Sequence, residues 1–170
     1  MELKKITPSE FPFIYNEMEK SFVKEEIRDF DDAKEVLENP LYEIFHISEK
    51  NENVGFITLW KLSEFYFVEH FVIFEKHRNC GFGKKAIELV CTKYEKVFLE
   101  AEPPCTDIAS RRIKFYERCG FVQNGFPYMQ PSYRKGGNGV ELVILSYKER
   151  LSQAEIAIEE LYNKVYGVKG

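Results

Sequence analysis

Apolar residues in the first forty positions recur with the spacing of one short strand followed by helices. Residues 3–6 predict the strand. Between Ser9 and Phe22 apolar side chains return every three or four residues, which predicts an amphipathic helix that Ser9 caps. A second helix is predicted over residues 31–38, because Asn39-Pro40 stops helical structure there.

The apolar pattern then changes to that of strands. Three segments, at residues 42–48, 54–61 and 65–74, are rich in aromatic and β-branched side chains. Lys50-Asn51-Glu52-Asn53 reads as a turn between the first two. These segments therefore predict an antiparallel meander.

Helical spacing returns after Gly83 and runs to Tyr94, and residues 97–99 read as a short buried strand. A further amphipathic helix is predicted over residues 110–119, with Gly120 at the position that commonly ends a helix. Strands at residues 121–122 and 141–147 close the sheet.

A long, mobile excursion is predicted between those last two strands, at residues 124–139. After the sheet, Ser152 and Glu155 form a capping-box pattern that predicts a tail helix over about residues 152–166, before Gly167. We find no repeat and no linker, so the 170 residues are predicted to form a single domain, with a core at residues 3–147.

The composition is that of a soluble globular chain, with 44% hydrophobic and 31% charged residues. The amino terminus lacks the apolar stretch of a signal peptide, and no apolar run approaches the length of a membrane span. The four cysteines form no C-x-x-C pair and fall in no cluster with the three histidines. We therefore expect a cytoplasmic protein with reduced thiols and without a metal or a membrane contact.

Charge is distributed unevenly around a net value of −4, which argues against bulk attraction to nucleic acid. Residues 1–50 hold 13 acidic and 7 basic side chains, whereas residues 76–135 hold 6 acidic and 12 basic ones. An anionic ligand would be favoured in the second window and a cationic one near the first third. The alternative is that both windows are solvated helix faces.

The stretch from Phe71 to Ala86 places glycines where a strand leads into a helix. Backbone N–H groups and the helix dipole favour a phosphate at such a helix start. It is not a Walker A loop, because Arg78 and Lys85 stand where that loop needs Gly and Ser or Thr.

Two other interpretations of this loop remain open. Gly81-x-Gly83-x-x-Ala86, with Glu100 about 20 residues on, fits a dinucleotide-binding pattern of a Rossmann-like protein. Two features argue against this pattern. The preceding strands are predicted to be antiparallel, and residues 75–80 separate the strand from Gly81. The glycines could also simply cap the helix.

Two motifs in this order resemble those of a known family. Arg78-x-x-Gly81-x-Gly83 after an apolar strand resembles the (Q/R)-x-x-G-x-G/A signature of the GNAT superfamily of acyl-CoA-dependent N-acyltransferases. Tyr116-Glu117-Arg118-Cys119-Gly120-Phe121 resembles that family's second motif at a helix end. The resemblance covers residues 3–147 and leaves the tail helix outside.

The resemblance implies an α/β (α+β) fold: a mixed, mostly antiparallel sheet with splayed central strands, flanking helices and here an extra C-terminal helix. It implies acetyl-CoA as co-substrate and a cleft for its pantetheine arm. The family asparagine that contacts this arm is Ala109 here, so Ser110 or Asp107 is expected to replace it. The remaining implied contacts come from strand backbone and loop N–H groups: Phe71, Val72, Ile73, Arg78, Asn79, Cys80, Gly81, Phe82, Gly83 and Lys84.

The implied reaction transfers acetyl from the thioester to an amine by direct attack, through a tetrahedral intermediate. Tyr116 stands at the place of the family's general acid, and a phenol can protonate a departing thiolate. The alternative is a core tyrosine on the same helical face as Ile113. In this family a backbone N–H near Ile73 stabilises the oxyanion.

Glu69 is our candidate base, since it shares strand parity with Phe71 and Ile73. The family glutamate would fall two residues earlier, where this chain has Phe67. Glu69 could instead order water, or a water chain could serve as base. Cys105 and Cys119 lack a histidine partner and are interpreted as structural rather than as thiol nucleophiles.

The acceptor pocket of the family comes from the loop between the first two helices and from the excursion. Here Glu25, Glu26 and Asp29 could attract an ammonium group, and Tyr128, Met129 and Tyr133 could wall an apolar slot. The alternative is a solvated charged turn. We expect a small primary amine as acceptor, and a protein amino terminus or lysine second.

Two other function classes remain open, a non-catalytic acyl-CoA-binding module and the Rossmann-like nucleotide-binding protein. Apolar residues on several faces of the tail helix, among them Ile156 and Leu161, could pack on the core or on a second subunit in a homodimer.

Overall fold

The structure is a computed structural model that describes residues 1–134 and 136–168. Its centre is a sheet in which seven strands follow the order β1-β2-β3-β4-β5-β8-β6, with β7 paired to β8 beside them. All neighbouring strands are antiparallel except β4 and β5. The strands are β1 (Glu2–Lys5), β2 (Tyr42–Glu49), β3 (Glu52–Lys61), β4 (Tyr66–Ile73), β5 (Val97–Ala101), β6 (Phe121–Gln123), β7 (Tyr128–Gln130) and β8 (Val140–Tyr147).

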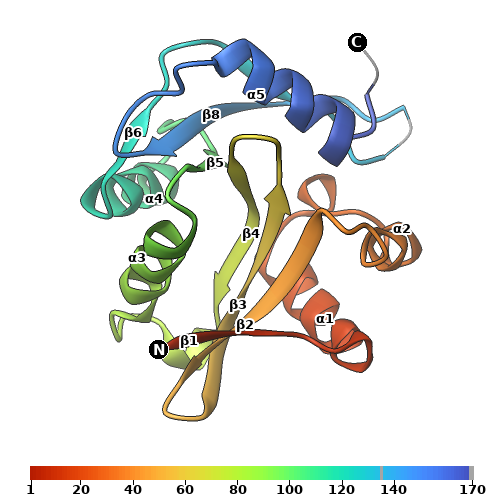
Figure 1. Cartoon of the computed structure of the whole chain (residues 1–170), viewed down its shortest axis with the longest axis vertical. Helices are drawn as coiled ribbons and strands as arrows, with labels where there is room; N and C mark the ends of the chain where they lie inside the picture. The colour runs from red at the N-terminus through yellow and green to blue at the C-terminus, as the bar shows by residue number, and fades with distance from the viewer. Residues whose placement is uncertain (135, 169–170) are drawn as a thin grey trace.

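Helices cover both faces of this sheet. In Figure 1, α3 and α4 lie on one side of the strands and α1 and α2 on the other. The helices are α1 (Phe11–Ser21), α2 (Phe30–Val36), α3 (Phe82–Tyr94), α4 (Asp107–Arg118) and α5 (Ala154–Glu160). Short helical turns are η1 (Pro8–Glu10), η2 (Lys24–Glu26), η3 (Glu75–His77) and the π-helical η4 (Leu161–Val165).

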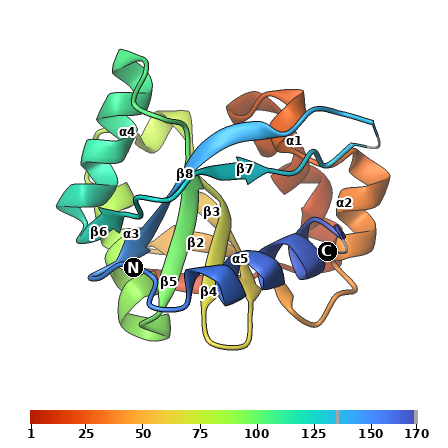
Figure 2. The ribbon, with the colours of Figure 1, turned by 90° about the horizontal axis from the view of Figure 1, so that it is seen from above.

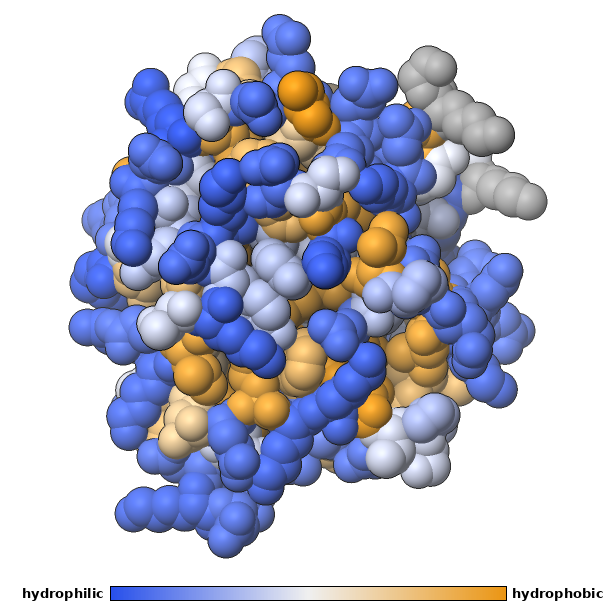
Figure 3. Space-filling model, in the orientation of Figure 1, coloured by the Kyte–Doolittle hydropathy of each residue, from blue (hydrophilic) through white to orange (hydrophobic). Residues whose placement is uncertain are grey.

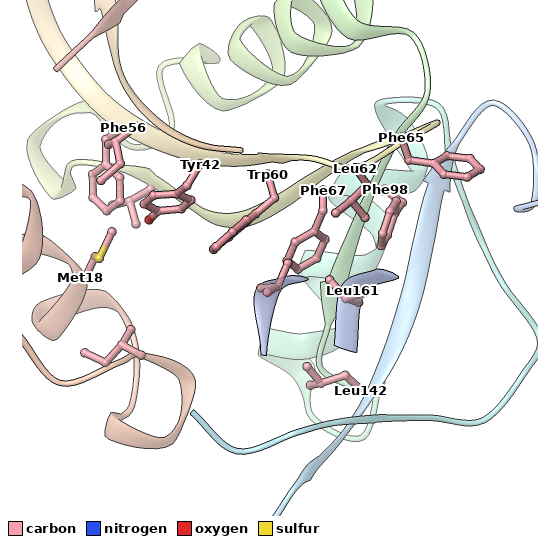
Figure 4. Packing of buried hydrophobic residues seen from close by; sticks show 14 of the residues in the cluster. Met18, Tyr42, Phe56, Trp60, Leu62, Phe65, Phe67, Phe98, Leu142 and Leu161 are labelled. Carbon is pink, nitrogen blue, oxygen red and sulfur yellow. The ribbon is translucent and has the colours of Figure 1, made fainter. Parts of the chain in front are cut away.

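Each face of the sheet has its own hydrophobic core. The core under α1 and the tail includes Trp60, Phe67 and Phe98, all at most 1% exposed. Figure 4 shows Met18 of α1 and Leu161 of η4 on the same side of these rings. Burying each such large side chain contributes about 1.5–3 kcal/mol. Leu161 and Val165 of the tail therefore pack on the chain's own core, which is the first of the two expected arrangements, whereas Ile156 is 50% exposed.

The second core lies under α3 and α4. It is built on helical positions spaced by three or four residues, such as Ile87, Val90 and Cys91, and on Leu145 of β8. This spacing is what the sequence predicted for the helix after the glycine loop. The two cores meet across the sheet, whose strands β4 and β5 both contribute to each side.

The central strands part after three residues of parallel pairing. Tyr66, Phe67 and Val68 pair with Val97, Phe98 and Leu99, and the pairing ends there. Beyond that point β4 continues to Ile73, and no strand in the described part of the chain pairs with its β5 side. The predicted splay of the central strands is confirmed, and it leaves an open strand edge inside the molecule.

β4 also contains a β-bulge at Glu69. Thr58 of β3 lies opposite His70, and Leu59 lies opposite Val68, so Glu69 is the extra residue. A bulge breaks the alternation of side chains along a strand and re-aims the residue that it contains. The expected shared parity of Glu69 with Phe71 and Ile73 is therefore wrong.

The predicted helices and strands are present, but several of their ends differ. The first helical stretch is capped by Thr7, whose backbone and hydroxyl bond to Glu10, rather than by Ser9. The helix predicted from 110 begins at Asp107, because the Thr106 hydroxyl accepts the Ala109 N–H. The tail helix begins at Ala154 without a side-chain cap, so the capping box at Ser152 is not formed.

The excursion after β6 is more regular than predicted. Three of its residues form β7, which pairs with β8 through Tyr128 and Leu142, Met129 and Glu141, and Gln130 and Val140. Too few apolar residues alternate here for the sequence to reveal a strand. No helix among the described residues is long and apolar enough to cross a membrane.

Candidate active site

The loop between β4 and α3 presents backbone N–H groups at the start of a helix. Gly81 precedes α3 with φ +77°, a left-handed conformation that glycine adopts without steric cost. The Lys85 N–H is bonded to the Gly81 carbonyl, so the N–H groups of Phe82, Gly83 and Lys84 have no acceptor in the helix. Arg78 Nε donates to the Ile73 carbonyl at 3.1 Å and fixes the loop to the end of β4.

This loop borders the first of three hollows, which we call the loop hollow. Its volume is about 580 Å³, and Arg78, Lys84, Arg112 and Arg118 give it a basic rim. Its wall is formed by Phe71, Ile73, His77, Arg78, Asn79, Gly81, Phe82, Gly83, Lys84, Arg112, Phe115, Tyr116, Arg118 and Cys119. Backbone donors and basic side chains at one helix start suit a pyrophosphate.

Most residues expected to bind the cofactor line this hollow, but three do not. Val72 is buried on the opposite face of β4, and Cys80 is an exposed loop residue. The Ser110 hydroxyl donates to the Pro104 carbonyl at 3.1 Å, so it helps to start α4. Ser110 therefore does not take the place of the missing asparagine in the hollow.

The second hollow, the strand-gap hollow, occupies the space where β4 and β5 part. It holds about 220 Å³ and shares Phe71, Ile73, Arg78, Arg112 and Tyr116 with the loop hollow. Its other lining residues are Ser21, Phe22, Val68, Glu69, Val72, Leu99 and Glu100. The gap between β4 and β5 thus leads from the glycine loop to the carboxylates of Glu69 and Glu100.

Tyr116 lies where these two hollows meet. Its ring packs on Phe115 and Phe121, with centroids 5.2 and 5.7 Å away, and burial raises the pKa of its phenol to about 12. A protonated phenol at this junction can act as a proton donor.

The third hollow, the acidic hollow, is small and carries four glutamates. Its volume is about 60 Å³, and it shares Glu69, Glu100 and Arg112 with the strand-gap hollow. The residues that line it are Phe22, Glu26, Glu69, His70, Glu100, Ala101, Glu102, Arg112, Gln130, Tyr133 and Leu142. A site of this size and charge suits a small cationic group.

Glu69 lies in this hollow as an ionised carboxylate that Arg28 and Tyr133 bind. Arg28 Nη1 donates to Glu69 Oε1 at 2.6 Å, and the Tyr133 hydroxyl donates to the same oxygen at 2.9 Å. Burial would raise the pKa of this carboxyl, but the Arg28 charge and neighbouring His70 outweigh burial and bring the pKa below its usual range. Its second oxygen, Oε2, is buried and makes no hydrogen bond among the described residues, and His70 Nδ1 lies 3.6 Å from it.

Glu100 has the opposite character. It is the first β5 residue after the parallel pairing ends, and the hydroxyls of Tyr128 and Tyr166 donate to its carboxylate. Burial is the largest influence and raises the pKa of Glu100 to about 7, although both tyrosine hydroxyls act to lower it. From the sequence, Glu100 is recognisable only in the dinucleotide pattern, because Tyr128 and Tyr166, its two partners here, lie far along the chain.

The residues expected to bind the amine are only partly brought together. Tyr128 is buried at 4% exposure and bonds to Glu100 instead of walling a slot, so that expectation is wrong. Glu26 lines the acidic hollow, where burial raises its pKa, whereas Glu25 is exposed and lines none of the three hollows.

The cysteines have the surroundings of structural residues. Cys119 borders the loop hollow, but burial raises the pKa of its thiol, which lowers the fraction of reactive thiolate. Cys105 is exposed and free. Within the described residues, no group of three or more His, Cys, Asp or Glu side chains could hold a metal ion.

The face seen in Figure 3 shows apolar side chains in separate patches between charged ones. The loop hollow includes apolar walls, from Phe71, Ile73 and Phe115, beneath a charged rim. This combination suits a ligand that has both a phosphate end and an uncharged arm.

Comparisons with known proteins agree with this geometry. The profile of the Acetyltransferase (GNAT) family matches residues 9–121. A solved GNAT-family protein from Bacteroides thetaiotaomicron is 31% identical, with a TM-score of 0.93, over 99% of this chain and 100% of that one. A search of curated proteins gave no significant match.

Two more distant solved structures share the fold. A spermidine N-acetyltransferase mutant from Vibrio cholerae is 16% identical, with a TM-score of 0.66, over 86% of this chain and 94% of that one. An acetyltransferase from Bacillus subtilis, solved with CoA, is 16% identical, with a TM-score of 0.59, over 88% of this chain and 97% of that one.

The Rossmann-like interpretation is wrong, because the sheet is mixed and mostly antiparallel. This chain belongs to the GNAT family of acetyltransferases.

Proposed function

We propose that this protein transfers the acetyl group of acetyl-CoA to a primary amine by direct attack. The observation that carries the proposal is the continuity of the three hollows. Arg112 lines all three, and Tyr116 joins the basic loop hollow to the gap that contains Glu69 and Glu100. A cofactor bound at the loop would thus have its reactive end near the two carboxylates.

The cofactor half of the site is built from backbone. The N–H groups at the start of α3 and the basic rim would hold the pyrophosphate. Among the described residues the edge of β4 at Phe71–Ile73 has no partner strand on its β5 side. Apart from the Ile73 carbonyl, which accepts Arg78 Nε, the peptide groups that face this side are available to the amides of a pantetheine arm. A backbone N–H of this edge would also stabilise the oxyanion.

The acceptor half divides two tasks between two carboxylates. Glu69 stays ionised, and its unpartnered Oε2 would accept a hydrogen bond from the incoming ammonium group. Glu100, with a pKa of about 7, would take the proton that the ammonium must lose, because its pKa is matched to neutral solution. The base role that the sequence suggested for Glu69 is thus better suited to Glu100.

Each bond change then has an assigned group. The neutral amine nitrogen attacks the thioester carbonyl carbon, and the electron pair moves onto the carbonyl oxygen. When the tetrahedral intermediate collapses, the C–S bond breaks, and the Tyr116 hydroxyl gives its proton to the departing sulfur. The former amine nitrogen loses a proton as the amide forms, and that proton restores the Tyr116 hydroxyl. The products are an acetamide and CoA.

The acceptor we favour is a small primary amine, with a protein amino terminus or lysine second. The acidic hollow supports this order, since about 60 Å³ admits an ammonium head and little else. Similar folds belong to a spermidine N-acetyltransferase and to the ribosomal-protein-S18-alanine N-acetyltransferase of Escherichia coli, so both acceptor types should be tested.

The experiment measures release of CoA thiol by the purified chain with acetyl-CoA. The acceptor panel is spermidine, a short peptide with a free amino-terminal alanine, and a peptide with a single lysine and a blocked terminus. Acetylated product, identified by mass spectrometry, is expected from at least one of these. Tight binding of acetyl-CoA without thiol release from any amine would instead favour the non-catalytic binding module.

A further inference from the structure

We propose that the C-terminal helix is part of the acceptor site, and that Tyr166 is the positioning residue for the Glu100 carboxylate. The inference rests on the proposed function. The family profile ends at residue 121, so nothing in the match assigns a role to the tail. In the structure, however, the end of the tail bonds to the Glu100 carboxylate and to Arg28, the ion-pair partner of Glu69.

Two consecutive tail residues reach Glu100 directly and Glu69 through Arg28. The Tyr166 hydroxyl lies 2.9 Å from Glu100 Oε1 and 2.7 Å from Oε2. The neighbouring Val165 carbonyl accepts Arg28 Nη2 at 2.7 Å, and Arg28 in turn is paired with Glu69. A single turn of the chain therefore orients the proposed base and the arginine that holds the second anion.

A change of helix type makes this possible. α5 passes into the π-helical η4, where the Tyr166 N–H bonds to the Leu161 carbonyl five residues earlier, at 3.3 Å. π-helical turns are rare and occur frequently at functional sites. The wider turn keeps Leu161 and Val165 in the core while Tyr166 is directed to Glu100.

The tail is also fixed at its outer side. The Glu160 carboxylate accepts the Ser63 N–H at 3.0 Å, at the turn between β3 and β4, and Figure 2 shows α5 beside that turn. Ala157 and Leu161 are fully buried against the sheet. Because packing holds the helix in place, the Tyr166 hydroxyl is pre-positioned and does not need to be ordered by the substrate.

Charged and titratable groups surround Glu100 from several elements. Together these groups set the pKa of Glu100, and the Tyr166 hydroxyl changes it. A hydrogen bond from this hydroxyl stabilises the ionised carboxylate, so removing the hydroxyl favours the protonated carboxyl. The groups concerned are Glu26 of η2, Glu69 and His70 of β4, Glu102 after β5, Arg112 of α4, Tyr128 of β7, Tyr133 of the following loop and Tyr166 of the tail, whereas the Tyr162 hydroxyl bonds to the Met129 carbonyl instead.

The test compares two tyrosines of the same helix. Tyr166→Phe removes the hydroxyl that reaches Glu100 and keeps the ring beside Tyr133. Tyr162→Phe removes a hydroxyl that donates to the Met129 carbonyl and makes no bond to either carboxylate. Initial rates of CoA release are measured from pH 5.5 to 9.5 with the fastest acceptor of the panel above.

We expect Tyr166→Phe to move the acid limb of the kcat profile up by about one pH unit, which lowers the rate about tenfold on that limb and little at high pH. The Tyr162→Phe profile should match that of the wild type. Calorimetric binding of acetyl-CoA should be the same in all three proteins. An unchanged limb in Tyr166→Phe, or an equal shift in both variants, would overturn the role of Tyr166.

A second readout does not depend on turnover. With ¹³C-labelled glutamate, the Glu100 carboxyl signal, assigned through Glu100→Gln, should titrate at higher pH in Tyr166→Phe than in the wild type. An identical titration overturns the inference even if the variant is slow. If wild-type protein acetylates no amine of the panel, the proposed function fails instead, and the tail loses its catalytic role with it.

Discussion

The two halves of the cleft are built in different ways. The half that would hold the cofactor comes mainly from one short stretch, residues 71–84, with a second wall from residues 112–119, and its proposed contacts use backbone groups at a strand end and a helix start. The half that would hold the amine is made of side chains from distant segments, among them Arg28, Glu69, Glu100 and Tyr166. Local sequence can therefore specify the first half, whereas only the complete fold assembles the second.

Their electrostatics differ as well. The loop hollow has a basic rim that includes the exposed side chains of Arg78 and Lys84. In the acidic hollow Glu102 and Arg112 are exposed, but Glu69 and Glu100 are not, so each of these two carboxylates needs partners: Glu69 has Arg28, and Glu100 has two tyrosine hydroxyls. Substitutions in the acceptor half should accordingly have larger effects than those in the cofactor half.

The largest effect on catalysis is expected from Glu100→Gln. Loss of a general base should lower kcat about 10²–10⁴-fold, while calorimetric binding of acetyl-CoA stays unchanged. Because the base works when deprotonated and its pKa is about 7, wild-type kcat should rise with pH through about 7, and this limb should vanish in the variant.

The matched control for Glu100→Gln is Glu141→Gln, an exposed position on β8. It should reproduce the wild-type profile. A Glu100→Gln enzyme with wild-type kcat and an intact acid limb would return the base role to Glu69 or to a water chain.

Arg28→Met should have the largest effect on stability. It leaves Glu69 buried without its cation, at side-chain exposures of 10% and 1% for the pair, and should cost about 3–5 kcal/mol of unfolding free energy. In the wild type the lowered pKa of Glu69 contributes stability above its unfolded pKa, about 4.3, which is lost as pH falls toward the folded value. In the variant, burial should raise the pKa of Glu69, so the deficit should shrink in acid.

Urea unfolding at pH 7 and pH 4 measures this difference. Lys4→Met provides the control, because its pair with Glu2 is exposed and should contribute little at either pH. An equal deficit for Arg28→Met at both pH values would mean that lost packing, rather than the unpaired charge, destabilises the variant.

The contrast between a cofactor half built locally and an acceptor half built from distant segments explains what the sequence could predict. The amphipathic helices, the meander and the glycine loop follow from local spacing, and the structure has them. Glu69 was placed on the wrong face because a bulge cannot be read from alternation alone. Tyr128 and Tyr166 were not linked to Glu100 because residues 28 and 66 positions apart meet only when β7 and the tail fold over the cleft.

Gly83→Val tests the cofactor half and should have a smaller effect. A Cβ at this position would lie 3.4 Å from the Phe115 ring, so the added methyl groups would enter the loop hollow. The Kd of acetyl-CoA should rise about tenfold or more, with the KM of the amine unchanged. Gly125→Val, at a position with open space around it, should bind acetyl-CoA as the wild type does. Normal binding by Gly83→Val would place the cofactor outside this hollow.

Tyr116→Phe should have the smallest effect of the four substitutions in the cleft, although Tyr116 lies where its two halves meet. A thiolate with a pKa near 8.5 is already a stable leaving group, so an added proton helps it less than deprotonation helps an amine with a pKa near 10. We expect kcat to fall about tenfold, with acetyl-CoA affinity and the acid limb of Glu100 unchanged. Rapid-quench measurement of the first turnover separates this step from product release. Tyr147→Phe, in the same aromatic cluster but outside the hollows, is the control, and equal rates for the two variants would make Tyr116 a packing residue.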